Sequence, residues 1–290
     1  MRLLAFVHRG RRSIGAEVSS NQVLDFNLAH GSLRAGMRAF LELGEGGMET
    51  ARSLLAKPPK GAILQTRDLH IVSPLSSEER PKVLCIGLNY ADHAAESGSK
   101  VPDEPLVFAK YSTALCGPGD NILNPPGATH LDYEVELVVV IGKRAKRVSE
   151  SEASDYVAGY TCGHDVSERQ YQRKDSQWVR AKSSDTFAPL GPVIVTKDEI
   201  PDPHVLALGC KVNGQVRQNS STHQIVFKVP QLVEFISNYI TLEPGDLIFT
   251  GTPPGVGFGM KPPQYLKPGD VVEVWIEKIG SLTNPVVAAD

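Results

Sequence analysis

The chain has 290 residues, a formal net charge of −3, a pI near 6.3 and 41% apolar residues. This length and composition can build one large domain, or one large and one small domain, around a sizeable core. The slightly acidic balance argues against a nucleic-acid-binding protein, and the lack of an apolar run of about 18 residues argues against a membrane span.

The first quarter of the chain predicts a small α+β unit. Two apolar segments, RLLAFV and SIGAEV, flank the turn sequence HRGRR and predict a β-hairpin. Residues 33–57 predict a helical stretch that is interrupted over Gly44–Gly47. The segment SPLSSEERPK, residues 73–82, is polar and rich in turn formers, and it predicts the end of this unit.

The remainder predicts many short strands and few helices. Strand sequences occur in KVLCIGLNY, LVFAK, EVELVVVIG, VAGYTCGHD, GPVIVT, ALGCKV, DLIFTG and DVVEVWIEKIG. Asn213-Gly214 predicts a tight hairpin, and residues 229–240 have the apolar spacing of a helix. We therefore expect an α+β, mainly β fold, with a small domain over residues 1–75 and a larger domain over residues 76–290.

Glu134 and Glu136 lie two residues apart in HLDYEVELVVVIG, which otherwise predicts a strand. Residues i and i+2 of a strand point to the same face, so two carboxylates would repel each other there unless a cation lies between them. The alternative is that one of them faces solvent and pairs with a lysine. Asp165 follows another predicted strand at a turn. Three such carboxylates suit Mg²⁺, Mn²⁺ or Ca²⁺, which prefer oxygen ligands.

Arg169 and Gln172 follow Asp165 at +4 and +7, and all three would share one face if a helix began at Asp165. Arg169 could then bind a substrate carboxylate through two hydrogen bonds, the alternative being a surface salt bridge. Lys182 lies in an apolar, Gly- and Pro-rich segment, so burial could lower its pKa and suit it to proton transfer. Thr252 lies in the glycine-rich loop TGTPPGVGFG, residues 250–259, whose backbone N–H groups could hold an anion together with the Thr252 hydroxyl.

His93 and Glu96 occur in GLNYADHAAESG with helical i, i+3 spacing. Glu96 could orient His93 as a general base, although a His–Glu pair of this kind is more often an ordinary surface contact.

Together these segments resemble the fumarylacetoacetate hydrolase superfamily. The matching segments occur in family order between residues 81 and 259: CIGLNYADHAAE, FAKYSTALCGPGD, DYEVELVVVIGK, GHDVSERQYQ, KSSDTFAPLGP, VNGQVRQ and IFTGTPPGVG. The resemblance implies a β-rich roll as the catalytic domain, a smaller N-terminal domain, and a homodimer as the smallest assembly.

The resemblance also implies a role for each candidate residue. The implied roles are metal ligands, usually of Mg²⁺ or Mn²⁺, for Glu134, Glu136 and Asp165; a water-activating pair on a mobile lid for His93 and Glu96; an active-site lysine for Lys182; and substrate contacts for Arg169, Gln172 and Thr252. The chain departs from the family pattern beside Lys182, where Ala181 replaces a common glycine and Ser184 replaces an apolar or aromatic residue. These departures bear on substrate choice more than on metal binding.

A metal beside these groups suits a small 2-oxo acid, because a bound metal ion can stabilise an enolate. One branch of the family is associated with keto–enol tautomerisation of oxaloacetate, and we take an oxaloacetate tautomerase as the first interpretation. The same residues could serve a C–C bond hydrolase of the fumarylacetoacetate or acylpyruvate type, or an oxaloacetate decarboxylase. An interpretation of another class is a catalytically silent metal-binding scaffold. We expect a cytoplasmic protein, the alternative being the mature form of a mitochondrial matrix protein.

Overall fold

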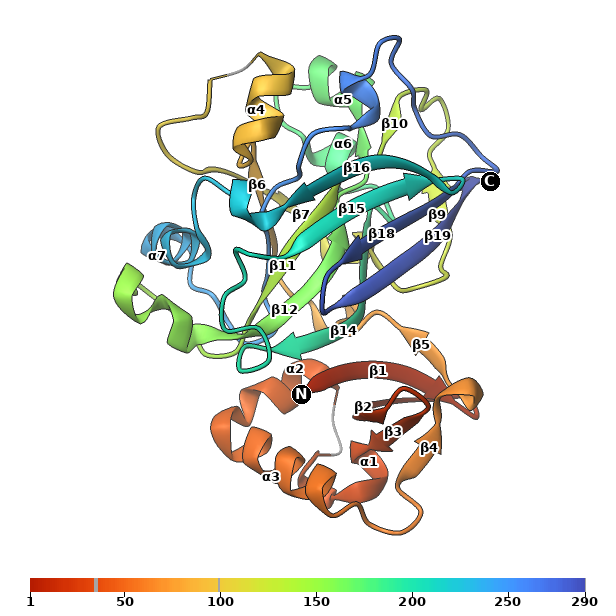
Figure 1. Cartoon of the computed structure of the whole chain (residues 1–290), viewed down its shortest axis with the longest axis vertical. Helices are drawn as coiled ribbons and strands as arrows, with labels where there is room; N and C mark the ends of the chain where they lie inside the picture. The colour runs from red at the N-terminus through yellow and green to blue at the C-terminus, as the bar shows by residue number, and fades with distance from the viewer. Residues whose placement is uncertain (34–35, 99, 290) are drawn as a thin grey trace.

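The structure, a computed structural model, describes residues 1–33, 36–98 and 100–289. Figure 1 shows two units stacked along the long axis of the molecule, with the N-terminal unit below the larger, strand-rich unit. Among the helices in these ranges, none is both long enough and apolar enough to cross a membrane.

The N-terminal unit is a small curved sheet packed against short helices (Figure 1). Its strands are β1 (Arg2–His8), β2 (Arg11–Ser19), β3 (Gln22–Asp25), β4 (Ile63–Gln65) and β5 (His70–Val72), and its helices are α1 (Phe26–Ala29), α2 (Met37–Glu42) and α3 (Gly44–Ala56). The predicted hairpin is confirmed, since β1 pairs with β2 in antiparallel register. The predicted break over Gly44–Gly47 is wrong: the break between α2 and α3 lies at Leu43, and α3 begins at Gly44 and includes these glycines. The burial of Gly47 and Ala51 outweighs the low helix propensity of glycine.

The largest sheet joins both units. Its strand order is β4-β3-β2-β1-β14-β12-β11-β17-β6-β7, with β5 added beside β1 and β8 beside β14. The strands of the larger unit in this sheet are β6 (Val83–Gly87), β7 (Leu106–Lys110), β8 (Leu115–Cys116), β11 (Val135–Ile141), β12 (Val157–His164), β14 (Ala188–Thr196) and β17 (Leu247–Phe249). Antiparallel pairing of β1 with β14 joins the N-terminal unit to the rest. The division into two domains stays a prediction, since one continuous sheet runs through both units.

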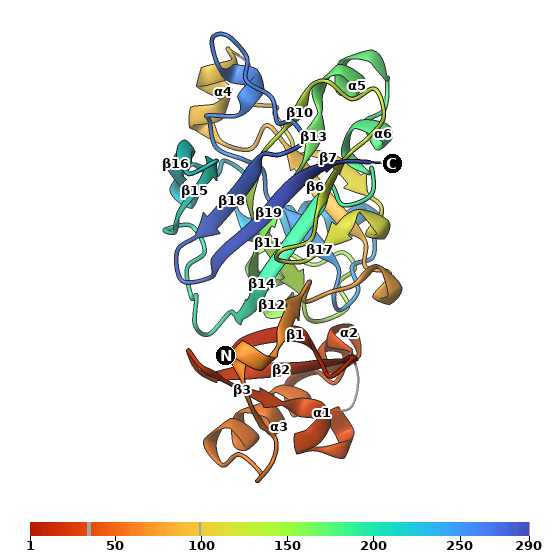
Figure 2. The same cartoon turned by 90° about the vertical axis from the view of Figure 1, so that its right-hand side faces the viewer.

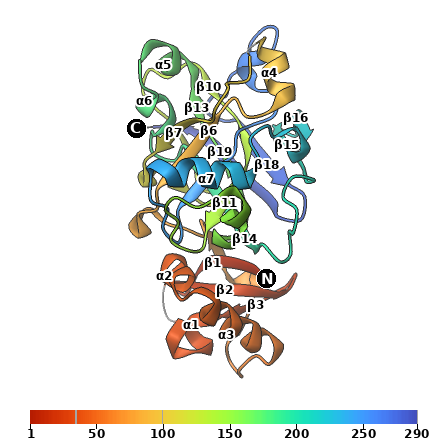
Figure 3. The ribbon, with the colours of Figure 1, turned by 90° about the vertical axis from the view of Figure 1, so that its left-hand side faces the viewer.

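A second sheet covers one face of the first. It has the order β16-β15-β18-β19-β9, and its strands are β9 (Ile122–Asn124), β15 (Ala207–Val212), β16 (Gln215–Ser221), β18 (Val271–Ile276) and β19 (Gly280–Ala288). Figure 2 shows β18 and β19 in front of β11, β12 and β14, and Figure 3 shows helix α7 (Val229–Tyr239) across the outer face of β11. The predicted helix over residues 229–240 is confirmed, and so is the Asn213-Gly214 hairpin, in which both residues have positive φ.

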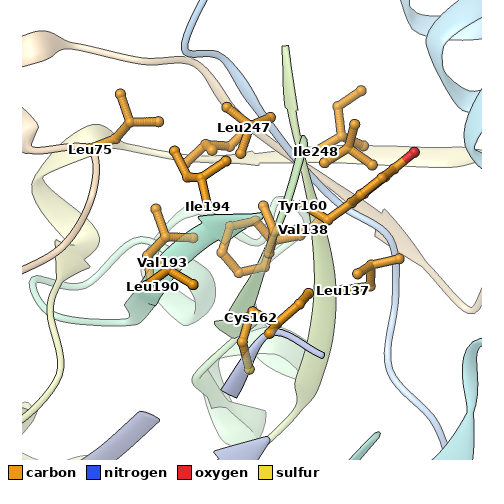
Figure 4. Close-up of a cluster of buried hydrophobic side chains, with 14 of the residues drawn as sticks. Leu75, Leu137, Val138, Tyr160, Cys162, Leu190, Val193, Ile194, Leu247 and Ile248 are labelled. Atoms are coloured by element: carbon orange, nitrogen blue, oxygen red, sulfur yellow. The ribbon is translucent and has the colours of Figure 1, made fainter. Parts of the chain in front are cut away.

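The core of the larger unit forms around β11. All seven residues of β11 are buried, because β12 and β17 flank it in the sheet and the two layers cover its faces. Apart from Glu136 the strand is apolar, and its run from Leu137 to Ile141 is typical of a strand that is buried on both sides. Figure 4 shows Leu137 and Val138 of β11 close to Tyr160 and Cys162 of β12 and to Ile248 of β17. This packing holds the ends of β11, β12 and β17 rigidly at the edge where the polar residues gather.

Three short helices and a two-stranded ladder complete the upper end of this unit in Figure 1. They are α4 (Ala91–Ser97), α5 (Arg169–Lys174), α6 (Val179–Lys182) and the small ladder of β10 (Leu131–Asp132) with β13 (Ser167–Glu168). The observed mixture of strands and short helices confirms the α+β, mainly β class predicted from the sequence.

Candidate active site

Three buried carboxylates meet where β11 and β12 pair. Glu136 lies on β11, Glu134 is the residue before β11, and Asp165 is the residue after β12. The N–H of Asp165 donates to the carbonyl oxygen of Glu134 at 2.9 Å. Each of the three offers an oxygen, and these oxygens lie within 4.8 Å of one another. Glu134 is 5% exposed and Glu136 is 2% exposed, so the alternative that one of them faces solvent is wrong.

Two buried lysines neutralise this group. The Lys182 Nζ donates to Glu134 Oε2 and to Asp165 Oδ2, both at 2.7 Å. On the other side of Asp165, the Lys110 Nζ lies 2.6 Å from Oδ1. Lys110 also donates to the carbonyl oxygens of Val166, Phe187 and Lys182. Lys110 at the end of β7 therefore anchors both Asp165 and the backbone of Lys182.

Arg169 is the third cation of the site, and its guanidinium is already engaged. Its Nε donates to Asp132 at 2.8 Å, its Nη2 donates to Glu134 at 2.5 Å, and its Nη1 donates to the side-chain oxygen of Gln172 at 3.0 Å. Arg169 is 7% exposed, so these are buried ion pairs and not a surface salt bridge. Helix α5 begins at Arg169, with Glu168 as its N-cap, so the expectation of one helix carrying Asp165, Arg169 and Gln172 is wrong.

Burial and charge shift the pKa values of these groups in different directions. Burial raises the pKa of Glu136 well above its usual value, and the charges of Asp165 and Glu134 raise it further. Burial acts on Glu134 in the same direction, but Arg169 and Lys182 outweigh it and hold the Glu134 pKa well below its usual range. For Lys182, burial lowers the pKa, but Asp165 and Glu134 raise it more, to about 12. The expected lowering of the Lys182 pKa is therefore wrong in this arrangement.

A cavity of about 250 Å³ opens beside these groups. Its lining combines carboxylates and cations with apolar and aromatic side chains. The residues that line it are Ile86, Gly87, Leu88, His93, Leu106, Phe108, Glu134, Glu136, Asp165, Arg169, Gln172, Trp178, Lys182 and Thr252. The cavity thus brings together most of the residues that the sequence singled out.

His93 and Glu96 meet over this cavity on α4, where the His93 Nδ1 lies 3.2 Å from Glu96 Oε2. Glu96 Oε1 also accepts the N–H of Gly255, so the pair is attached to the glycine-rich loop. His93 lines the cavity and Glu96 stands behind it. This placement differs from that of an ordinary surface pair, because both residues contact other parts of the site.

The backbone N–H groups of the glycine-rich loop do bind carboxyl groups, and these belong to side chains of the protein itself. The N–H of Gly251 donates to Glu136 Oε2 at 2.7 Å, and Gly251 has φ of +98°, a conformation that glycine adopts readily. The Thr252 hydroxyl donates to the carbonyl of Val135 at 2.9 Å. Thr252 lines the cavity, and its predicted contact with substrate stays a prediction.

Sequence reasoning missed two charged residues of the site. Asp132, Glu134 and Glu136 alternate along HLDYEVE, so the period of a strand could have grouped Asp132 with the two glutamates. Lys110 ends the apolar strand sequence LVFAK and is the buried residue of that strand, and a buried lysine normally has a fixed anionic partner. Neither signal names the partner, which lies far away in the sequence.

The three carboxylates fit a hard divalent cation. All three are oxygen donors, and within the described residues Glu136 uses only Oε2, for Gly251. When Glu136 has lost its proton, the four carboxylates Asp132, Glu134, Glu136 and Asp165 face the three cations Lys110, Arg169 and Lys182, which leaves one negative charge in excess. Oxygen ligands with excess negative charge are what Mg²⁺ and Mn²⁺ require.

Known proteins match both the sequence and the fold. Residues 82–287 match the sequence model of the fumarylacetoacetate (FAA) hydrolase C-terminal family. The chain belongs to this family, as its motifs predicted. It is 45% identical to a Xenopus laevis protein named a mitochondrial oxaloacetate tautomerase, over 99% of this chain and 90% of that one.

Two solved structures extend the comparison. A fumarylacetoacetate hydrolase from Exiguobacterium antarcticum is 34% identical, with a TM-score of 0.85 and full coverage of both chains. A maleylpyruvate hydrolase from Sphingobium sp. SYK-6, in complex with manganese(II) ion and pyruvate, is 27% identical, with a TM-score of 0.82 and full coverage of both chains.

Proposed function

We propose that the chain is a divalent-metal-dependent enzyme that acts on 2-oxo dicarboxylic acids through an enolate, and that its reaction is the keto–enol tautomerisation of oxaloacetate. The observation that carries the proposal is the group of three buried carboxylates that line the cavity, with the Lys182 Nζ at 2.7 Å from two of them. The relative from Xenopus laevis supports the reaction, because its name is that of an oxaloacetate tautomerase.

Glu134, Glu136 and Asp165 would hold the ion. We propose Mg²⁺ or Mn²⁺, with Ca²⁺ as the alternative that the same oxygen ligands accept. When bound, the ion supplies Lewis-acid stabilisation of the negative charge on the 2-oxo oxygen. The similar maleylpyruvate hydrolase was solved in complex with both manganese and a 2-oxo acid, pyruvate, which supports this ion and this class of substrate.

Lys182 moves the proton at C3. Its pKa of about 12 makes Nζ an ammonium at neutral pH, so Lys182 acts as an acid when enol becomes ketone. A proton passes from Nζ to C3 as the enol hydroxyl loses its proton to His93. His93 then releases that proton to solvent and Nζ regains one from solvent, which restores both groups for the next turnover. Glu96 orients His93 through Nδ1. Because one positioned acid or base contributes about 10²–10⁴-fold, Lys182→Met should lose at least 100-fold in rate; a rate equal to wild type would contradict this role.

Arg169, Gln172 and Thr252 complete the proposed substrate contacts, since all three line the cavity. Arg169 already binds two carboxylates, so it acts mainly as a fixed positive charge facing the substrate. Gln172 accepts from Arg169 through its oxygen, and its amide nitrogen can donate to a substrate carboxylate.

A C–C bond hydrolase is the second candidate, and the His93–Glu96 contact favours it. Hydrolysis requires an activated water, and a histidine that a carboxylate orients beside a cavity can activate one. The similar structure of a fumarylacetoacetate hydrolase supports the same alternative. A decarboxylase would use the same residues and differ in its product.

The deciding experiment follows the absorbance of enol-oxaloacetate with Mg²⁺ or Mn²⁺ and then with EDTA, while pyruvate is assayed in parallel. Metal-dependent loss of enol without pyruvate is the expected result. Pyruvate formed at the rate of oxaloacetate loss would instead identify a decarboxylase. If neither rate changes, acylpyruvates become the next substrates to assay, and inactivity on these as well would favour a silent metal-binding protein.

We also propose a homodimer. Strand β7 is the last strand of the large sheet as described, and large apolar side chains beside it are exposed: Leu106 by 45%, Tyr111 by 61% and Val179 by 42%. Burying them against a second copy would remove apolar surface from water. For the compartment, the name of the relative from Xenopus laevis supports the mitochondrial alternative, and the cytoplasmic expectation stays a prediction.

A further inference from the structure

Asp132, a buried carboxylate outside the proposed ligand set, holds two parts of the site together. Its Oδ1 accepts the N–H groups of Gly257 at 2.7 Å and of Tyr133 at 2.9 Å. Its Oδ2 accepts the N–H of Phe258 at 3.1 Å and the Nε of Arg169 at 2.8 Å. Asp132 is 0% exposed. Four donors on two oxygens fix the position of this carboxylate, and they tie Arg169 to the backbone of the loop.

On one side this network reaches helix α4, which carries the His93–Glu96 pair. The same loop that binds Asp132 through Gly257 and Phe258 binds Glu96 through the N–H of Gly255, at 3.0 Å. Glycine is required at position 257, because a Cβ there would collide with the carbonyl oxygen of Gln264 and lie 2.8 Å from Asp132 Oδ1. The position of the loop thus depends on Asp132, and the position of Glu96 depends on the loop.

On the other side the network reaches the proposed metal ligands. Arg169 divides its charge between Asp132 and Glu134, with Nε on the first and Nη2 on the second. If Asp132 lost its charge, the full attraction of Arg169 would fall on Glu134 Oε1. Arg169 would then compete more strongly for a carboxylate that a metal ion needs.

We propose that Asp132 is a positioning residue that couples the loop under α4 to the metal ligand Glu134 through Arg169. The seating of α4 over the cavity and the metal affinity of the three carboxylates then change together. This inference rests on the metal site proposed above. It adds a residue that touches neither the metal nor the substrate, and it explains why two segments far apart in the sequence, at Arg169 and at Gly257–Phe258, both donate hydrogen bonds to one buried aspartate.

The first test measures binding of Mn²⁺ alone, without substrate, by the electron paramagnetic resonance signal of free Mn²⁺. Asp132→Asn keeps the shape of the side chain and removes its charge, and it should weaken Mn²⁺ binding at least 10-fold, within the range of about 10–100-fold for partners of metal ligands. The matched control is Asp246→Asn. Asp246 is also 0% exposed, accepts the N–H groups of Lys82 at 2.9 Å and of Glu243 at 2.8 Å, and pairs with the Lys82 Nζ at 2.6 Å, at the other end of β17. Its variant should bind Mn²⁺ like wild type.

A double-mutant cycle separates positioning from the simple loss of a negative charge. In an Arg169→Gln background, Asp132→Asn should change Mn²⁺ affinity by less than about 2-fold, because the connection through Arg169 is already absent. A 10-fold loss of Mn²⁺ affinity that persists in this background would mean that the negative charge of Asp132 acts directly on the bound ion and not through Arg169. That result would overturn the proposal.

Hydrogen exchange of the protein without Mn²⁺ gives a second readout. The amides of Gly257 and Phe258 should exchange at least 10-fold faster in Asp132→Asn than in wild type, and those of α4 should follow. Asp246→Asn should leave both segments unchanged. Faster exchange with unaltered Mn²⁺ affinity would show that Asp132 only anchors the loop, which would also overturn the coupling.

A surface variant covers the case in which Asp132→Asn does not fold. Arg173 is exposed and stacks on the ring of Phe258 at 4.5 Å, so Arg173→Met loosens the loop and leaves the buried network intact. Loss of a nearby positive charge alone would strengthen Mn²⁺ binding, whereas the coupling predicts binding about 2- to 5-fold weaker. Tighter or equal binding would overturn the proposal. If wild type itself binds no Mn²⁺, the metal site fails first and the coupling fails with it.

Discussion

Removing Lys182 tests the charge balance of the site most directly. Its Nζ lies 2.7 Å from Glu134 Oε2 and 2.7 Å from Asp165 Oδ2, and the residue is 2% exposed. Lys182→Met keeps an unbranched apolar side chain and removes the ammonium. Breaking a buried ion pair from one side costs about 3–5 kcal/mol, because the remaining carboxylates stay buried without compensation. We expect the free energy of unfolding in EDTA at neutral pH to fall by this amount.

The pKa of Lys182 fixes the pH range of this effect. The folded-state pKa of about 12 lies above the value of about 10.4 for an unfolded chain, so folding favours the charged form. The stability that the charge contributes is therefore fully present below the unfolded pKa and is lost as the pH rises through the folded pKa. The difference between wild type and variant should be constant around neutral pH and shrink above about pH 10.

Denaturant unfolding in EDTA and in excess Mn²⁺ is the assay. Without Lys182, the cation should bind Glu134 and Asp165 more tightly. A 10-fold tighter dissociation constant would give the variant about 1.4 kcal/mol more Mn²⁺ stabilisation than wild type. The control is Lys82→Met, which breaks the pair with buried Asp246 and should show no extra Mn²⁺ effect. A variant as stable as wild type in EDTA, or no more stabilised by Mn²⁺, would refute the reasoning.

Three further predictions concern single groups. Burial and neighbouring charges raise the pKa of Glu136, so Mn²⁺ binding should release about one proton, measured by calorimetry in buffers of different ionisation enthalpy. Glu136→Gln should lose Mn²⁺ binding, while its free energy of unfolding in EDTA changes by less than about 1 kcal/mol. Mn²⁺ binding without proton release would contradict this prediction. Ser220→Ala removes the 2.6 Å hydrogen bond to Asp92 on α4 and should speed amide exchange of α4 several-fold, and unchanged exchange would refute that anchor. Burial, then the charge of Lys228, lowers the pKa of His204, whose Nε2 accepts the N–H at the start of α7. The fold therefore favours the neutral imidazole, and the free energy of unfolding should fall as the pH drops below about 6.5. His204→Ala lacks this titration, and an equal fall in that variant would contradict the prediction.

The chain itself determined the local elements and the nature of the ligand set. The hairpin of β1 and β2, the Asn213-Gly214 turn and helix α7 follow from turn residues and apolar spacing, which act over a few positions. The alternation of Glu134 and Glu136 places both on one face of a strand, whatever surrounds it. The predicted break over Gly44–Gly47 was wrong, because the burial of Gly47 and Ala51 on α3 outweighs the low helix propensity of glycine.

Only the tertiary structure decided how the charges pair. Lys110 reaches Asp165 because β7 and α6 pack beside the end of β12, and Asp132 holds Arg169 because β10 pairs with β13. The direction of the Lys182 pKa shift depended on the same packing: burial alone lowers the pKa, and two carboxylates at 2.7 Å raise it. Electrostatic energy depends on distance and burial, and both are set by contacts between segments far apart in the sequence.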